Sequence, residues 1–193
     1  MKCLFTRHLA SFSAAILIFA STSAVFAQNA SDDDKHFVEA ALKGGMAEVE
    51  LGKLASQKGA SSDVKQFGQK MVVDHTMMGD QMKAVAEKIG VTPPSMDTPS
   101  DMALKAKLEV LTGAAFDKAY ISAMVKGHED DLADFRKEIA NGTSPAVKSV
   151  TSQGESLVER HLAMIRKIAQ AHNVSASFRK PSPSTLASVT GSR

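Results

Sequence analysis

Residues 62–89 read SDVKQFGQKMVVDHTMMGDQMKAVAEKI, with apolar side chains at the three- and four-residue intervals of an amphipathic helix. Seven residues form the apolar stripe: Val64, Phe67, Met71, Met78, Met82, Val85 and Ile89. Asp63 lies in the expected first turn, and Gly90 followed by Pro93 ends the helix. His75 falls on the same stripe, so we expect its imidazole to point into the protein.

The chain on both sides of this segment is also predicted to be helical. Ser31 before three aspartates is typical of a helix start, and Gly59 is typical of a helix end. Pro99 and Pro145 fit the first position of two later helices. We therefore expect long helices over residues 31–58, 62–89, 112–140 and 145–173, and a short one over residues 98–111.

These elements predict an all-α fold, a ferritin-like four-helix bundle with a long connection between the second and third long helices. Two short turns, at residues 59–61 and 141–143, make each helix pair antiparallel. The connection over residues 90–111 can reach about 50 Å, whereas a helix of about 27 residues is roughly 40 Å long. It can cross the whole bundle and give an up-down-down-up order; an up-down-up-down order stays open.

Three segments of different composition are expected. Residues 1–27 resemble a signal peptide, with Lys2 and Arg7 before an apolar stretch and a small-residue cleavage site before Gln28. Residues 28–173 form the bundle, and residues 174–193 are a disordered tail rich in Ser and Pro. We expect an exported protein, located in the periplasm or associated with the outer membrane, with no transmembrane span after signal cleavage.

The composition of the exported chain excludes several kinds of site. The only cysteine of the sequence, Cys3, lies in the expected signal segment. The exported chain therefore has no thiol, which excludes thiolate metal sites and disulfides. Without Lys2 and Arg7, 21 basic side chains face 21 acidic ones, which argues against a nucleic acid partner. No phosphate-binding glycine loop or nucleophile elbow is present, and the sequence predicts no catalytic residue.

Each long helix carries one inward polar residue that can bind a proton or a metal ion. They are Glu48, His75, His128 and His161. At a rise of 1.5 Å per residue, their distances along the helix axis from the nearest hairpin turn are about 15, 20, 18 and 26 Å, in the same order. All four are therefore expected near the middle of the bundle and within reach of one another.

Two interpretations of this set remain open. In one, the four residues form a satisfied polar network that fixes the helix register. In the other, three imidazoles and one carboxylate bind a transition metal, for which zinc or copper is suited. A di-iron site is disfavoured, because Val72 and Val158 stand where Glu-x-x-His motifs need glutamate. Asp74 lies about 60° from the stripe and is not expected to replace them.

Methionines near His75 and His128 fit a Cu(I) site, but packing is the expectation we prefer for them. Tyr120 and Asp117 are assigned no chemistry. The sequence makes no prediction of oligomeric state.

Several segments resemble a known family. They are FVEAALKGGMAEVELGKLA over residues 37–55, VKQFGQKMVVDH over residues 64–75, Phe116, Asp117 and Tyr120 ahead of His128, and ERH over residues 159–161. They are similar to the exported bacterial domain of unknown function four-one-four-two, over about residues 32–173. The resemblance implies an exported ferritin-like four-helix bundle and brings no established activity.

Two functions follow as expectations. The first is a periplasmic protein that binds a metal or acts in metal or envelope stress through Glu48, His75, His128 and His161. The second is a non-catalytic structural or interaction module that contacts envelope proteins, with the polar cluster specifying packing only.

Overall fold

A computed structural model describes residues 30–96 and 98–175 of this chain. These residues form five α-helices and no strand: α1 (Asp32–Lys58), α2 (Ser62–Ile89), α3 (Pro99–Glu109), α4 (Gly113–Asn141) and α5 (Pro145–Ala171). The all-α prediction is confirmed, and the helix limits differ from the expected ones by at most two residues. The expected signal peptide, residues 1–27, lies outside the described residues, as does the expected tail from residue 176 onward.

The helices begin where local polar groups satisfy their free N–H groups. The Ser31 hydroxyl accepts the N–H of Asp34, and the Asp34 carboxylate accepts the N–H of Ser31 in return. Thr98 and Asp101 make the same reciprocal pair at the start of α3. Gly90 ends α2 with φ +75°, a backbone conformation that glycine adopts without strain.

Contacts at the two ends of the bundle fix the direction of each long helix. At one end, Asp117 near the start of α4 accepts the N–H groups of Ala60 and Ser61 in the α1–α2 turn, both at 2.9 Å. At the other end, Asp34 at the start of α1 accepts the N–H of Thr143 in the α4–α5 turn, at 2.9 Å. Helices α2 and α4 therefore run one way, and α1 and α5 run the other.

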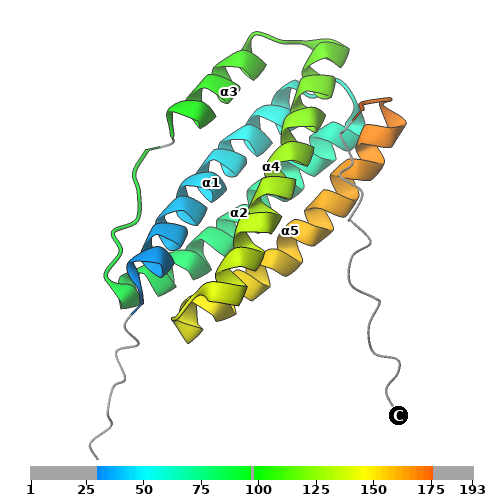
Figure 1. The fold of residues 1–193 in the computed structure, drawn as a ribbon. Coiled ribbons are helices and arrows are strands. Elements are labelled where there is room, and N and C mark those ends of the chain that lie inside the picture. The colour runs from blue at the N-terminus through cyan, green and yellow to red at the C-terminus, as the bar shows by residue number, and fades with distance from the viewer. Residues whose placement is uncertain (1–29, 97, 176–193) are drawn as a thin grey trace, which may run out of the picture.

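This order is the up-down-down-up alternative, and the up-down-up-down alternative is wrong. The chain between α2 and α4 crosses the length of the bundle, and α3 lies within that crossing on the outside of α1 (Figure 1). Lys105 of α3 pairs with Glu50 of α1 at 3.1 Å, and Leu108 is fully buried beneath it. Within the described residues, no helix combines the length and the apolar content required to cross a bilayer.

The apolar core is divided into two parts. The larger cluster, around Phe67, Tyr120 and Ile165, receives residues from all five helices. The smaller cluster consists of Val38, Leu42, Met82, Ala86, Val147 and Val150, and therefore comes from α1, α2 and α5 only. Beyond His128, Glu138 is the one buried residue of α4. The half of α4 that follows His128 is rich in acidic residues and adds no fully buried apolar side chain, so the bundle is less tightly packed in this half.

The close packing of α1 on α2 depends on two facing glycines. A Cβ atom added to Gly68 would lie 2.7 Å from the carbonyl oxygen of Gly52 and 2.8 Å from the backbone N of Ser56. We expect Gly68→Ala to lower the free energy of unfolding by about 1–3 kcal/mol, because backbone atoms must move apart. Urea denaturation measures this change.

Gly79→Ala is the matched control on the same helix. A Cβ atom at Gly79 meets no other atom within 4 Å. This variant is expected to be more stable than the parent by about 0.5–1 kcal/mol, as alanine favours a helix over glycine. Equal effects of the two substitutions would contradict the proposed close contact.

Candidate functional site

The structure brings the four predicted polar residues together between the two apolar clusters. Glu48 comes from α1, His75 from α2, His128 from α4 and His161 from α5. The three imidazole rings form a triangle with centroid separations of 5.1, 5.6 and 5.9 Å. His128 and His161 are fully buried, and His75 is 6% exposed. The prediction that the four residues meet in mid-bundle is thus matched by their positions.

A hydrogen-bonded chain runs through most of this cluster. The Nδ1 atom of His75 lies 2.8 Å from Oε2 of Glu48, and its Nε2 lies 3.2 Å from Nδ1 of His161. On the other side of that ring, Nε2 of His161 lies 2.8 Å from Oδ2 of Asp74. Asp74 in turn pairs with Lys70 at 2.7 Å. These contacts are satisfied when His75 is an imidazolium that donates to Glu48 and His161, and neutral His161 donates to Asp74.

The charges along this chain support that arrangement. Burial alone would raise the pKa of Glu48, but the positive charge of His75 and the hydrogen bond from it, together with the nearby His128, lower this pKa to about 2. Burial opposes a charge on His75, yet the charge and hydrogen bond of Glu48 raise its pKa above the usual value. Burial and the neighbouring imidazoles lower the pKa of His161 to about 4.

His128 differs from the other two histidines. Its Nδ1 lies 2.9 Å from the carbonyl oxygen of Met124 and donates to it, so the lone pair is on Nε2. Among the described residues, this buried Nε2 has no hydrogen-bond partner. Burial lowers the pKa of His128, which keeps the ring neutral. A buried nitrogen lone pair without a partner costs free energy, and a bound cation would remove that cost.

The spacing of the three imidazoles is compatible with one metal ion. His75, His128 and His161 each offer a nitrogen atom, and these atoms lie within 4.8 Å of one another. Two nitrogens bound to one tetrahedral zinc ion are separated by about 3.3 Å, close to the 3.2 Å between His75 and His161. Glu48 is not in this group: it contacts Nδ1 of His75, whereas Nε2 of that ring faces His161.

Sequence reasoning missed two carboxylates of the site. Asp74 is 9% exposed and contacts His161, so it belongs to the cluster, although the sequence considered it only as a replacement for the missing di-iron glutamates. Its angle to the apolar stripe of α2 is unchanged, but α5 approaches that side of the helix. Asp131, one turn after His128, lies with Glu48 and His128 in a second group whose ligand atoms are within 4.8 Å of one another. The three-residue spacing from His128 was the available signal for Asp131.

Comparison with known proteins places the chain in a family. The model of a domain of unknown function, DUF4142, matches residues 20–168. The chain belongs to this family. No activity comes with that membership, and none of the curated proteins matches the chain.

One solved structure supports the fold of this DUF4142 member. The crystal structure of a DUF305 fragment from Deinococcus radiodurans is 15% identical and superposes with a TM-score of 0.66. The match covers 74% of this chain and 98% of that fragment. At this identity the likeness supports the helical-bundle fold alone.

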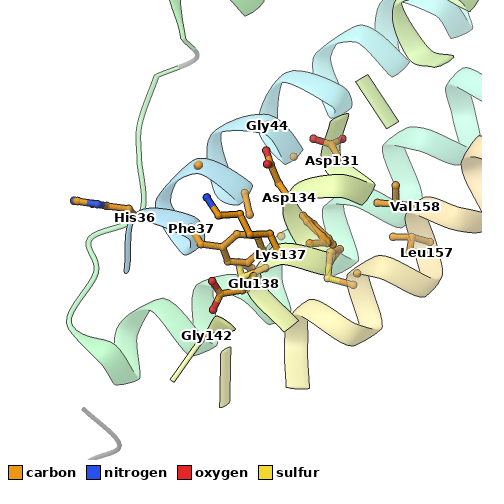
Figure 2. Close-up of a pocket in the computed structure, with 18 of the residues that line it drawn as sticks. His36, Phe37, Gly44, Asp131, Asp134, Lys137, Glu138, Gly142, Leu157 and Val158 are labelled. Atoms are coloured by element: carbon orange, nitrogen blue, oxygen red, sulfur yellow. The ribbon is translucent and has the colours of Figure 1, made fainter. Parts of the chain in front are cut away.

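The cluster of this DUF4142 chain opens into a cavity of about 510 Å³ between α1, α2, α4 and α5 (Figure 2). Glu48 and His75 lie at its inner end, and Asp131 stands beside them on α4. Glu138 lines the opposite end, two helical turns further along α4. The cavity occupies the half of the bundle in which α4 contributes little to the apolar core.

Asp131 is the least compensated carboxyl group in this cavity. Burial, the negative charges of Glu48, Asp134 and Asp130, and its hydrogen bond with Glu48 raise its pKa to about 8. Asp131 therefore holds a proton at neutral pH and donates it to the Glu48 carboxylate.

Proposed function

We propose that this protein binds a transition metal ion, zinc or copper, through the imidazoles of His75, His128 and His161. The partnerless, buried Nε2 of His128 carries the proposal, because the other two rings lie at a spacing suited to the same ion. Glu48 and Asp74 would hold the rings of His75 and His161 in place, as carboxylates commonly do around histidine ligands. We propose a ferritin-like four-helix bundle as the scaffold, supported by its single long crossing connection.

The experiment is metal challenge of the purified protein followed by dialysis and elemental analysis. We expect about one zinc or copper ion per chain for the parent and a near-complete loss for His128→Ala. His172→Ala is the matched control, because His172 pairs with Asp63 at the end of the bundle, away from the cluster. Metal bound equally by the parent and His128→Ala, or by neither, would reject the proposal.

A purely structural role is the second candidate, favoured by the unbroken chain from Lys70 through Asp74, His161 and His75 to Glu48. In that case the cluster fixes the register of four helices and needs no ion. The two candidates differ in one measurement: only the metal-binding candidate predicts a rise in melting temperature with added zinc that His128→Ala removes.

We also propose that the protein is exported and acts in the cell envelope. The support is the signal-like composition of residues 1–27. Expression of the full chain in a Gram-negative host, periplasmic extraction and N-terminal sequencing test this. A mature chain beginning at Gln28 is expected, and an intact cytoplasmic chain would reject export.

A further inference from the structure

The cavity lies beside the proposed metal ligands, and it has the size and the wall chemistry of a site for a small molecule. Its volume of about 510 Å³ is within the usual range for such sites, roughly 300–1,000 Å³. The walls are mainly apolar: Phe37, Met78, Met82, Phe135, Leu157 and Val158. A metal ion alone needs no chamber of this kind, so the apolar walls indicate a ligand with a hydrocarbon part.

The charged groups of the cavity are mostly acidic. Asp131 and Asp134 lie on one turn of α4 (Figure 2). Asp131 is beside Glu48, whereas Asp134 is exposed. The charges that act on Asp131 come from Glu48, Asp134 and Asp130, all of them acids. The basic or ionisable nitrogen groups at the edge of the cavity are those of Lys137, which is exposed, and His36, whose side chain extends outward (Figure 2). At the inner end the charges of Glu48 and His75 offset each other, so the remaining charges nearby, those of Asp134 and Asp130, are negative and favour a cationic group over an anionic one.

Two glycines leave space in the cavity for the hydrocarbon part of a ligand. Gly44 and Gly79 line it from α1 and α2, and a Cβ atom on either would meet nothing within 4 Å. Glycine inside a helix normally costs stability relative to alanine. Here it keeps open the space between the apolar side chains and the carboxyl groups.

We propose that this cavity binds a primary alkylamine, with the ammonium group at Asp131 and the alkyl chain along Phe37, Met78 and Phe135. Asp131 releases its proton to water when the ammonium group binds, and the ammonium group then donates hydrogen bonds to the resulting carboxylate. The apolar walls remove the alkyl chain from water. The alkylamine is placed at Asp131 and the apolar walls, whereas the proposed metal ion is placed at ring nitrogens of His75, His128 and His161. Because His75 also lines the cavity, the two proposals are tested apart by measuring amine binding without metal.

The test uses the full-length protein in EDTA, so that metal binding does not contribute. Isothermal titration calorimetry with n-octylamine is expected to show saturable binding at one site per chain. Octanoate has the same chain with the opposite charge and is expected not to bind. Equal binding of the two compounds, or no binding of octylamine, would overturn the proposal.

Two variants locate the site, and a third serves as control. Gly44→Leu fills the cavity and is expected to abolish octylamine binding. Gly127→Leu changes a helical glycine whose Cβ position is equally open but which does not line the cavity, so it should bind as the parent does. Asp131→Asn should weaken binding about ten- to a hundredfold, the usual loss for a hydrogen bond to a charged group. Unchanged octylamine binding by Gly44→Leu would refute the assignment of the binding site to this cavity.

Discussion

Replacing Glu48 by leucine in the metal-free protein is expected to lower the free energy of unfolding by about 3–5 kcal/mol near neutral pH. Glu48 accepts the Nδ1–H of His75 at 2.8 Å, and its Oε1 lies 3.4 Å from Nδ1 of His128. The leucine variant leaves the imidazolium of His75 buried without its carboxylate. An uncompensated buried charge of this kind is one of the most destabilising single changes known.

The sign of the pH dependence follows from His75. Its pKa is raised in the folded protein, so the pair stabilises fully below the usual pKa of histidine and loses this contribution as the pH rises through the folded value. The cost of Glu48→Leu should therefore shrink at alkaline pH. Urea denaturation in EDTA, repeated across that range, measures it.

Two further variants separate this effect from general disturbance of α1. Glu48→Leu combined with His75→Leu should recover most of the lost stability, because both charges are removed together. Glu39→Leu alters a partly exposed ion pair with Lys43 on the same helix and should cost less than about 1 kcal/mol. If Glu48→Leu were as mild as Glu39→Leu, the buried charged pair would not exist.

The architecture was largely predictable because its signals are local. Ser31 with Asp34, Thr98 with Asp101, and Gly90 mark helix ends through contacts within four residues. The depth of Glu48 and His75 was predictable for a related reason. A short turn makes two helices antiparallel, so residues at equal distances from it lie at similar levels.

Asp74 and Asp131 show what the geometry of a single helix does not predict. A count of 100° per residue places a side chain relative to its own helix. It does not give the side from which a neighbouring helix approaches. His161 of α5 reaches Asp74 at 2.8 Å because of how α5 packs beside α2, and that depends on the whole crossing connection. The cavity was unpredictable for the same reason, since it depends on how closely α4 packs on α1.

Asp34 makes both a local contact, which the sequence predicts, and a long-range contact, which it does not. The sequence identifies it as an acid in a first helical turn, and this is correct. It also accepts hydrogen bonds from the N–H and the hydroxyl of Thr143, which is 109 residues away. Asp34 is therefore fully buried, and its hydrogen bonds hold its pKa well below the usual range despite that burial.

The carboxyl group beside it, Glu138, leads to the second large effect that we expect. Burial, followed by the hydrogen bond and charge of Asp34, raises the pKa of Glu138 to about 7 from an ordinary value of 4.5. Between these values the folded protein holds a proton that the unfolded chain has released. Stability must therefore fall as the pH rises from about 4.5 to about 7, by on the order of 3 kcal/mol from this group.

Glu138→Gln isolates this contribution, because other titrating groups such as His75 and Asp131 remain in both proteins. The glutamine amide can donate to Asp34 as the protonated acid does, but it does not titrate. We expect similar unfolding free energies for the parent and Glu138→Gln at about pH 5, and an advantage of roughly 2–3 kcal/mol for the variant at about pH 8. Urea denaturation at several pH values gives the difference. A difference that stays constant from pH 5 to pH 8 would mean that Glu138 is ionised in the folded protein, and that Asp34 is held by Ser31, Thr143 and Ser144 without it.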